Sequence, residues 1–216
     1  MMQRSPDEQW MTTMTDRVSG SRVHAVGGEG GLSTEGRPLT TTVLELGCGF
    51  SKTPGAFGVD VIPGSQADLI HDLNSVPYPF DDNEWDRIIC LDVLEHVEDV
   101  VKTIDEIWRI SKPGALIEIS GPFMSSVHYH TDPTHRRAFT SRSFDYFCPG
   151  RPLHRYGYSK AAFELLECEY DRGDPGRRGI AGLITRWANR HKDRYELRYA
   201  YIYPMLQINF TLRTIK

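Results

Sequence analysis

Three histidines and an aspartate lie close together in the second half of the chain, at His128, His130, Asp132 and His135. An imidazole has an unperturbed pKa of about 6.5, so it can accept a proton near neutral pH. His128 or His135 could therefore act as a general base toward a hydroxyl group. We treat His128, Asp132 and His135 as candidate catalytic residues.

Each of these side chains also has a structural interpretation. Asp132 before Pro133 favours a turn, and His135 could satisfy a buried carbonyl or cap the next segment. The cluster could bind a divalent metal ion, but its spacing fits no standard zinc pattern, so we expect no metal site. The pair Glu95-His96 follows a strand-like run, where such a pair more often caps a helix and fastens the loop beside a cofactor.

A glycine loop follows the first buried-strand pattern, which covers residues 43–46 and ends at Gly47-Cys48-Gly49. Glycine lets the backbone approach a ligand closely, and turn amides there can hold a carboxylate or a phosphate. The dinucleotide fingerprint needs a third glycine and an acidic residue about 20 positions further on. Here Lys52 takes the third position and Asp60 comes only 11 positions after Gly49, so a nicotinamide cofactor is disfavoured.

S-adenosylmethionine needs other contacts: donors for its carboxylate, an acceptor for its ammonium group, a carboxylate for the ribose hydroxyls and an acceptor near the adenine amino group. The chain offers such a set, in order, at Glu45, the two glycines, Asp60 and Asp72. S-adenosylmethionine is therefore the expected cofactor.

Five segments, in order, resemble the motifs of class I S-adenosylmethionine-dependent methyltransferases: residues 43–49, 58–60, 71–73, 91–96 and 108–114. The resemblance covers residues 43 to 122. It implies that Gly47 and Gly49 cradle the methionine portion, that Asp60 holds the ribose and that Asp72 faces adenine. A subgroup with similar segments at 52–55, 72–80 and 132–137 extends the match to about Phe147 without fixing an acceptor. The candidate cofactor-binding residues are Glu45, Gly47, Cys48, Gly49, Lys52, Asp60, Val61, Asp72, Leu73, Leu91, Asp92 and His96.

The elements that must position these residues alternate as in a doubly wound α/β fold. We expect strands at 43–46, 56–60, 67–70, 86–91 and 115–120, and a closing antiparallel hairpin at 162–170 and 206–215. Apolar residues at spacings of three and four predict a helix from Val93 to Trp108, stopped by Pro113-Gly114. Pro54-Gly55 breaks any helix between Gly49 and the second strand. The expected fold is a Rossmann-like sheet, mostly parallel, whose first helix is missing or reduced to a turn.

Residues 1 to about 40 are polar and glycine-rich, which predicts a flexible leader, part of which could fold as a lid. We expect residues 41–216 to form one methyltransferase domain, with 123–160 and 171–205 as acceptor-site loops or inserts. Four scattered cysteines without a C-x-x-C pair predict free thiols. No run approaches the roughly 18 apolar residues of a membrane span, and no secretory signal is evident, so we expect a cytoplasmic protein without a membrane partner.

The net charge of −4 conceals an asymmetry, because residues 1–135 hold 9 Lys or Arg and 21 Asp or Glu, whereas residues 136–216 hold 16 and 8. These charges could simply solvate surfaces. The sharper interpretation is a basic pocket for an anionic acceptor, since arginine favours bidentate recognition of carboxylates and phosphates.

The leading functional hypothesis is a biosynthetic enzyme that methylates an oxygen or nitrogen of a small molecule, because the acceptor region is a compact insert. An RNA or protein methyltransferase is the alternative. A nucleic-acid partner is disfavoured, since the chain has neither a strong positive charge nor an added binding module. A third hypothesis is a silent scaffold, although the retained glycines and Asp60 favour cofactor binding. A homodimer is left open.

Overall fold

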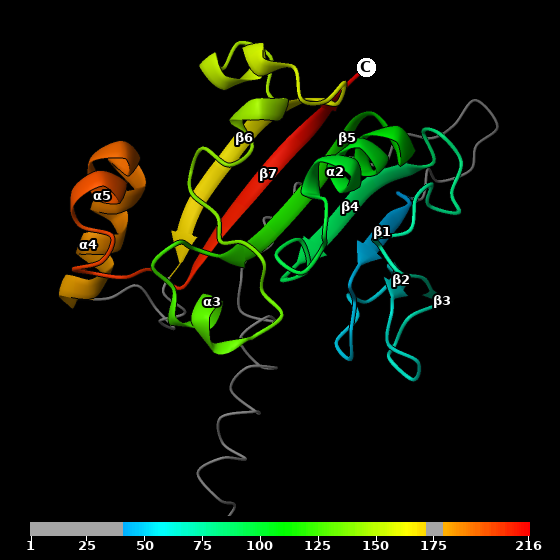
Figure 1. Ribbon diagram of the computed structural model, residues 1–216, viewed down its shortest axis with the longest axis horizontal. Helices are drawn as coiled ribbons and strands as arrows, with labels where there is room; N and C mark the ends of the chain where they lie inside the picture. Colours follow the sequence, from blue (N-terminus) through cyan, green and yellow to red (C-terminus); the bar gives the residue numbers. More distant parts are fainter. Residues whose placement is uncertain (1–40, 172–178) are drawn as a thin grey trace, which may run out of the picture. The chain divides into compact units, whose positions relative to one another are not determined.

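A seven-stranded sheet forms the centre of the computed structural model, which describes residues 41–171 and 179–216 (Figure 1). Its strands lie in the order β3-β2-β1-β4-β5-β7-β6. The first five run parallel, whereas β7 is antiparallel to both β5 and β6. The strands are β1 (Val43–Leu46), β2 (Phe57–Asp60), β3 (Leu69–Ile70), β4 (Trp85–Leu91), β5 (Ser111–Pro122), β6 (Ala162–Asp171) and β7 (Gln207–Ile215). The predicted doubly wound sheet with a closing antiparallel hairpin is confirmed.

The middle strands are buried on both faces. In β4 the consecutive residues Ile88, Ile89 and Cys90 are all buried, although successive side chains of a strand point to opposite faces of the sheet. Such a strand must be covered on both sides, as in other parallel sheets. Helix α2 (Val100–Ile110) contributes Ile104 and Ile107 to the same core.

Helix α2 begins later than the apolar pattern predicted. Its N-cap is Asp99, whose Oδ1 accepts hydrogen bonds from the amides of Val101 at 3.0 Å and Lys102 at 3.1 Å. Leu94 and Val97 precede the helix in an irregular segment and are nevertheless buried. The predicted start at Val93 is therefore wrong, because apolar spacing reports burial and here the buried segment is not helical.

No helix occurs between β1 and β2 among the described residues, where 47–56 form turns. The prediction of a missing first helix is confirmed. The sheet order reverses between β1 and β4, which lie side by side at its middle. Ligands of open parallel sheets bind at the carboxyl ends of the strands at such a point.

The C-terminal part places two short helices, α4 (Gly179–Arg190) and α5 (Lys192–Arg198), beside β6 (Figure 1). Tyr195 of α5 is buried, with its ring centroid 5.1 Å from that of Tyr170, which in turn lies 4.9 Å from that of Phe123. Tyr195 is therefore a packing ring. Tyr201, by contrast, is 75% exposed.

Residues Thr41–Lys216 form one compact unit. The predicted leader and lid, and the arginines at 172, 177 and 178, lie outside the described residues. None of the described helices has both the length and the apolar character that crossing a membrane requires.

Candidate functional site

The glycine loop lies at the carboxyl end of β1 and is shaped by one close contact. Gly47 has φ +72°, and its amide donates to the carbonyl of Val59 at 2.8 Å. A Cβ placed on Gly47 would lie only 2.6 Å from Cβ of Val93, in the segment that follows β4. Gly49 also has positive φ, at +50°, but open space surrounds the position of its missing Cβ. The loop is therefore closed against Val93 at Gly47 and open at Gly49.

Two buried carboxylates fix this loop. Asp60 Oδ2 accepts from the Gly49 amide and Oδ1 from the Ile62 amide, both at 2.8 Å. Glu45 Oε2 accepts from the Thr53 amide at 2.6 Å. Side-chain oxygens thus order the backbone where related sheets would use a helix N-terminus.

The structure places Lys52 and Cys48 beside β2. The Lys52 ammonium lies 2.6 Å from Asp68 Oδ2. Cys48 is buried, and burial, followed by the charges of Asp60 and Glu45, raises the pKa of its thiol to about 11. Neither side chain therefore provides a free reactive group in the loop.

The ends of β2 and β3 present the next predicted residues. Val61 follows the buried Asp60 and is 58% exposed. Asp72 is exposed and accepts from the Asn74 amide at 2.9 Å, whereas Leu73 is buried. Asn74 Oδ1 accepts from the amide of Glu98 at 2.7 Å, so this edge is tied to the segment after β4.

Asp92 comes directly after Leu91, the last residue of β4, and has φ +50°, a conformation that few non-glycine residues adopt. Gln207, the first residue of β7, donates through Nε2 to both carboxylate oxygens of Asp92 at 2.9 and 3.0 Å. This contact could not be predicted from the sequence, because the two residues are 115 positions apart and Gln207 belongs to no recognised motif.

Glu95 lies in the same segment and is fully buried. Neither of its carboxylate oxygens has a hydrogen-bond partner among the described residues. Burial, followed by the charge of Asp92, raises the pKa of Glu95 to about 8. Because α2 begins only after Asp99, the expectation that Glu95-His96 caps the helix is wrong.

The guanidinium of Arg137 holds the backbone around Glu95 in place. Its Nη1 donates to the carbonyls of Leu94 at 2.8 Å and Val97 at 2.5 Å, and its Nη2 donates to that of Glu98 at 3.0 Å. This single side chain satisfies three carbonyls of a segment that precedes α2 and is not itself helical.

Two imidazoles face Glu95. His135 Nε2 lies 3.8 Å from Glu95 Oε1, and the His135 ring centroid lies 4.6 Å from that of His96. His96 Nδ1 is 2.9 Å from Thr134 Oγ1, which in turn donates to Asp132 Oδ1 at 2.6 Å. The structure therefore brings Asp132, His135 and His96 into one network, together with Glu95, which was not among the candidate residues.

His128 makes no hydrogen bond to this network, although it lies close enough to Asp92 for an electrostatic interaction. It lies on α3 (Val127–Thr131), where its amide donates to the N-cap Ser126 Oγ at 3.1 Å. Its imidazole makes no hydrogen bond within the part of the chain that the structure describes.

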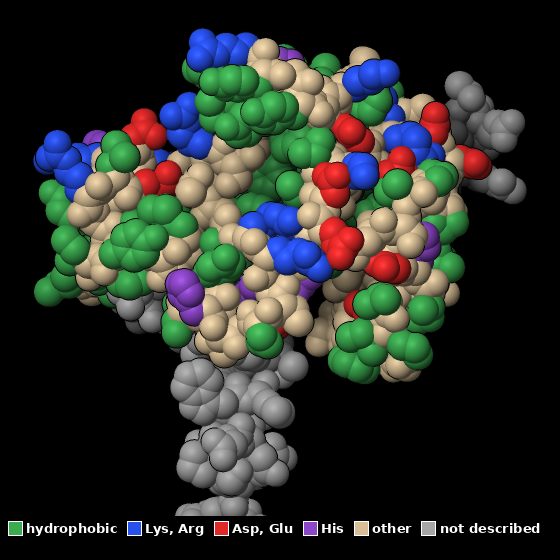
Figure 2. Space-filling view, in the orientation of Figure 1, with side chains coloured by type: hydrophobic (Ala, Val, Ile, Leu, Met, Phe, Trp, Pro, Cys, Tyr) green, Lys and Arg blue, Asp and Glu red, His purple; other side chains and the backbone are tan. Residues whose placement is uncertain are grey.

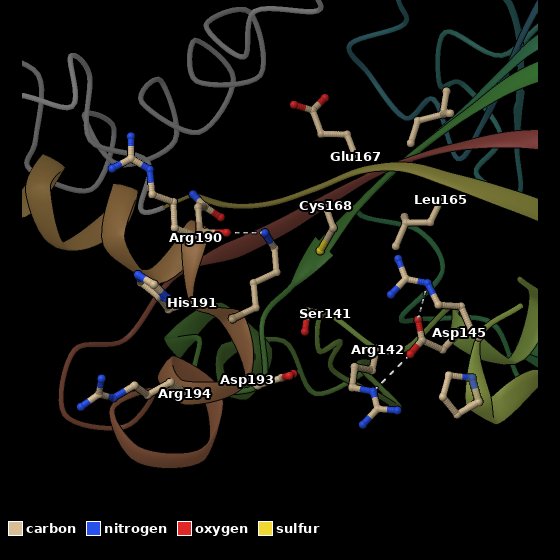
Figure 3. A pocket seen from close by; sticks show the side chains of 15 residues that line it. Ser141, Arg142, Asp145, Leu165, Glu167, Cys168, Arg190, His191, Asp193 and Arg194 are labelled. Atoms are coloured by element: carbon tan, nitrogen blue, oxygen red, sulfur yellow. Dashed lines mark hydrogen bonds and ion pairs between the residues drawn. The ribbon is translucent and has the colours of Figure 1, made fainter.

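Five of the basic residues in the second half of the chain line a cavity away from the glycine loop. A cavity of about 810 Å³ lies between β6 and the helices α4 and α5 (Figure 3). Among its lining residues, Asp145 lies 3.1 Å from Arg142 Nε and 3.8 Å from Arg151 Nε. Three further basic residues line it, Arg190, Lys192 and Arg194. In the sheet order, β7, β5 and β4 separate β6 from the glycine loop of β1.

Comparisons with known proteins agree with this geometry. Residues 44–119 match a family described as methyltransferase domain. A comparison with curated protein sequences gives no match.

Three solved structures share the fold. The first is an S-adenosylmethionine-dependent methyltransferase from Thermotoga maritima, with a TM-score of 0.54 and 14% identity over 97% of this chain and 95% of that one. The second is the [4+2]-cyclase SpnF, with a TM-score of 0.51 and 19% identity over 100% of this chain and 84% of that one. The third is the YcgJ protein from Bacillus subtilis, with a TM-score of 0.51 and 14% identity over 82% of this chain and 92% of that one. Because one of the three is a cyclase, the reaction must be argued from the site and not from the fold.

Proposed function

We propose that the chain is a class I S-adenosylmethionine-dependent methyltransferase, since residues 44–119 match a methyltransferase domain, and that it methylates an oxygen or nitrogen atom of a small molecule in a biosynthetic reaction. The observation that carries the proposal is that two groups of residues lie at the same edge of the sheet. We call them the first half-site, which is the glycine loop with Asp60, and the second half-site, which is the segment around Glu95. The glycine loop after β1 packs at Gly47 against Val93, and Glu95 with its two imidazoles follows only two residues later.

The first half-site suits the cofactor. Open space at Gly49 and the amides of its turn can hold a carboxylate, and the Asp60 carboxylate lies beside the exposed apolar Val61. We assign Gly47 and Gly49 to the methionine portion, Asp60 to the ribose, and Val61 with Asp72 to the adenine side. When bound, the cofactor supplies an electrophilic methyl group on a sulfonium ion.

Since Lys52 is paired with Asp68, we assign the cofactor carboxylate to the turn amides rather than to the Lys52 ammonium.

The second half-site suits a small acceptor. The segment after β5 turns back over the strand ends, because the Arg136 amide donates to the carbonyl of Glu95 at 2.9 Å. In-line displacement depends mainly on alignment and on exclusion of water, which these packed segments provide. A hydroxyl or ammonium acceptor must also lose a proton. We assign that role to His128, whose imidazole has no hydrogen-bond partner among the described residues.

The distribution of charge supports a small molecule over a nucleic acid. On the face drawn in Figure 2, basic side chains are spread over several places and alternate with acidic ones, without a continuous basic surface. The basic cavity lies beside β6 and not at the ends of β4 and β5. The proposal therefore specifies a small acceptor without fixing its charge.

The test is transfer of a labelled methyl group from the cofactor to a metabolite extract, to total RNA and to denatured cell protein in parallel. We expect label in low-mass products. Label found only in RNA or protein would overturn the proposed acceptor class, and no transfer to any pool would favour a silent scaffold.

Asp60→Ala tests the cofactor assignment in the same preparation. We expect calorimetry to show a severe loss of S-adenosylmethionine affinity. The matched control is Asp81→Ala, an exposed carboxylate in the loop before β4, which should bind like the wild type. Equal affinity of the two variants would remove Asp60 from the site.

A further inference from the structure

A carboxylate and two imidazoles converge at the carboxyl ends of β4 and β5. One ligand atom each from Glu95, His96 and His135 lies within 4.8 Å of the others. We propose that these three residues bind a divalent transition-metal ion, which holds an oxygen of the methyl acceptor. Binding of the ion stands on the geometry alone, whereas its role toward the acceptor rests on the proposed function.

Glu95 supplies the first argument. It is fully buried, and both of its oxygens lack a hydrogen-bond partner within the described residues. Burying an unpaired polar or charged group is costly, so buried charges are normally paired or coordinate a metal. Arg137 donates to backbone carbonyls of this segment and makes no hydrogen bond to the Glu95 side chain. A cation between Glu95 and the imidazoles would satisfy it.

The hydrogen bonds of the imidazoles give the second argument. His135 Nδ1 lies 3.2 Å from the carbonyl oxygen of Tyr129, so this nitrogen must be the donor. The Thr134 hydroxyl donates to Asp132, so it accepts from His96 Nδ1. Both rings therefore carry a proton on Nδ1, and Nε2 of a neutral ring keeps its lone pair. A carbonyl or hydroxyl partner of this kind is the usual outer support of a metal-binding histidine.

The distance between Glu95 and His135 gives the third argument. At 3.8 Å, Glu95 Oε1 and His135 Nε2 are too far apart for a hydrogen bond. Two ligands bound at about 2.0 to 2.2 Å from one ion stand roughly 3.0 to 3.5 Å apart. Small side-chain rotations would bring these atoms to that separation. No hydrogen bond joins the two atoms, and a cation between them would bind both.

The ligand set defines the class of ion. Two imidazoles and one carboxylate suit zinc, manganese, iron or cobalt in the divalent state, and they leave coordination positions open. An acceptor oxygen in an open position would have its pKa lowered. That oxygen would lose its proton to His128, and its bond to the methyl carbon would form as the sulfur–methyl bond breaks and the neutral thioether leaves. No change of oxidation state is involved.

The local spacing of the histidines could not reveal this site. His135 comes from the loop after β5, whereas Glu95 and His96 come from the segment after β4. The three meet because parallel neighbouring strands end at the same edge of the sheet.

The test uses the full chain, treated with chelator and titrated with Co²⁺ in the absence of cofactor. We expect one equivalent of Co²⁺ to bind and to give visible d–d absorption. The matched control His130→Asn, an exposed neighbour, should behave like the wild type. Glu95→Gln and His135→Gln should abolish the absorption, and Thr134→Val, which removes the support of His96, should weaken binding about 10-fold or more.

Two outcomes would overturn the proposal: no stoichiometric Co²⁺ binding by the wild type, or unchanged binding by Glu95→Gln. Circular dichroism checks that the buried variants fold, and His96→Gln, at a half-exposed position, provides an independent test if they do not. Methyl transfer is measured separately. A chelated protein that still methylates small molecules at the full rate would refute the role of the ion while leaving the proposed function intact.

Discussion

Replacing Gly47 by alanine tests the contact that joins the two half-sites. An alanine there must adopt φ +72°, which costs an L-residue about 1–2 kcal/mol. Its Cβ would also lie 2.6 Å from Cβ of Val93, so the segment after β4 must move. Overpacking of this kind costs about 1–3 kcal/mol. We therefore expect the free energy of unfolding to fall by about 2–5 kcal/mol in total.

Gly49→Ala is the matched control, because it adds the same methyl group at φ +50° with no atom within 4 Å of it. Only the backbone cost of about 1–2 kcal/mol should remain. Urea unfolding of both variants gives the difference. Val93→Gly in the Gly47→Ala background removes the Cβ at 2.6 Å together with its methyl groups, so it should recover the packing part, as a double-mutant cycle would show. If both glycine variants lost the same stability, or if Val93→Gly gave no recovery in that cycle, the contact would not constrain the loop.

Two further predictions concern the capping of α2 and the thiol in the loop. Asp99→Ala removes the acceptor of two amides at the start of α2 and should lower the free energy of unfolding by about 0.5–2 kcal/mol; a variant with wild-type urea stability would contradict the assigned N-cap. Because the pKa of Cys48 is raised from 9.0 to about 11, its thiolate fraction near pH 7.5 should be about 100-fold smaller than that of an ordinary thiol. Peptide mapping after iodoacetamide should find Cys48 unmodified in the native protein and alkylated in urea, and rapid alkylation of the native protein would refute the burial argument.

Most strands could be predicted from the sequence to within two residues, because buried strands leave short apolar runs between turn residues. The exception is β5, which begins at Ser111, four residues before its predicted start, because the strand continues through Pro113-Gly114. The start of α2 could not be predicted. Leu94 and Val97 are buried because the segment after β4 packs into the core, and this burial imitates helical spacing while Asp92 takes a left-handed conformation.

Some residues of the candidate site could likewise be expected from the sequence, and others could not. The glycine loop and Asp60 could be proposed together from the sequence, and the structure joins them through the Gly49 amide, because their contacts lie within one short stretch of chain. The pairing of Glu95 with His135 and of Asp92 with Gln207 depends on which strands are neighbours, and a single sequence does not contain that information.

The carboxylates that replace the first helix have a consequence for folding. The contacts that shape the glycine loop join residues 8, 11 and 16 positions apart. The contact that steadies Asp92 spans 115 positions. Because short loops close at a lower entropic cost and therefore sooner, we expect the nucleotide-holding half to be assembled while the acceptor half is still open. The cofactor half-site would then form before the acceptor half-site during folding, and the pairing of β7 with the sheet would be the last step.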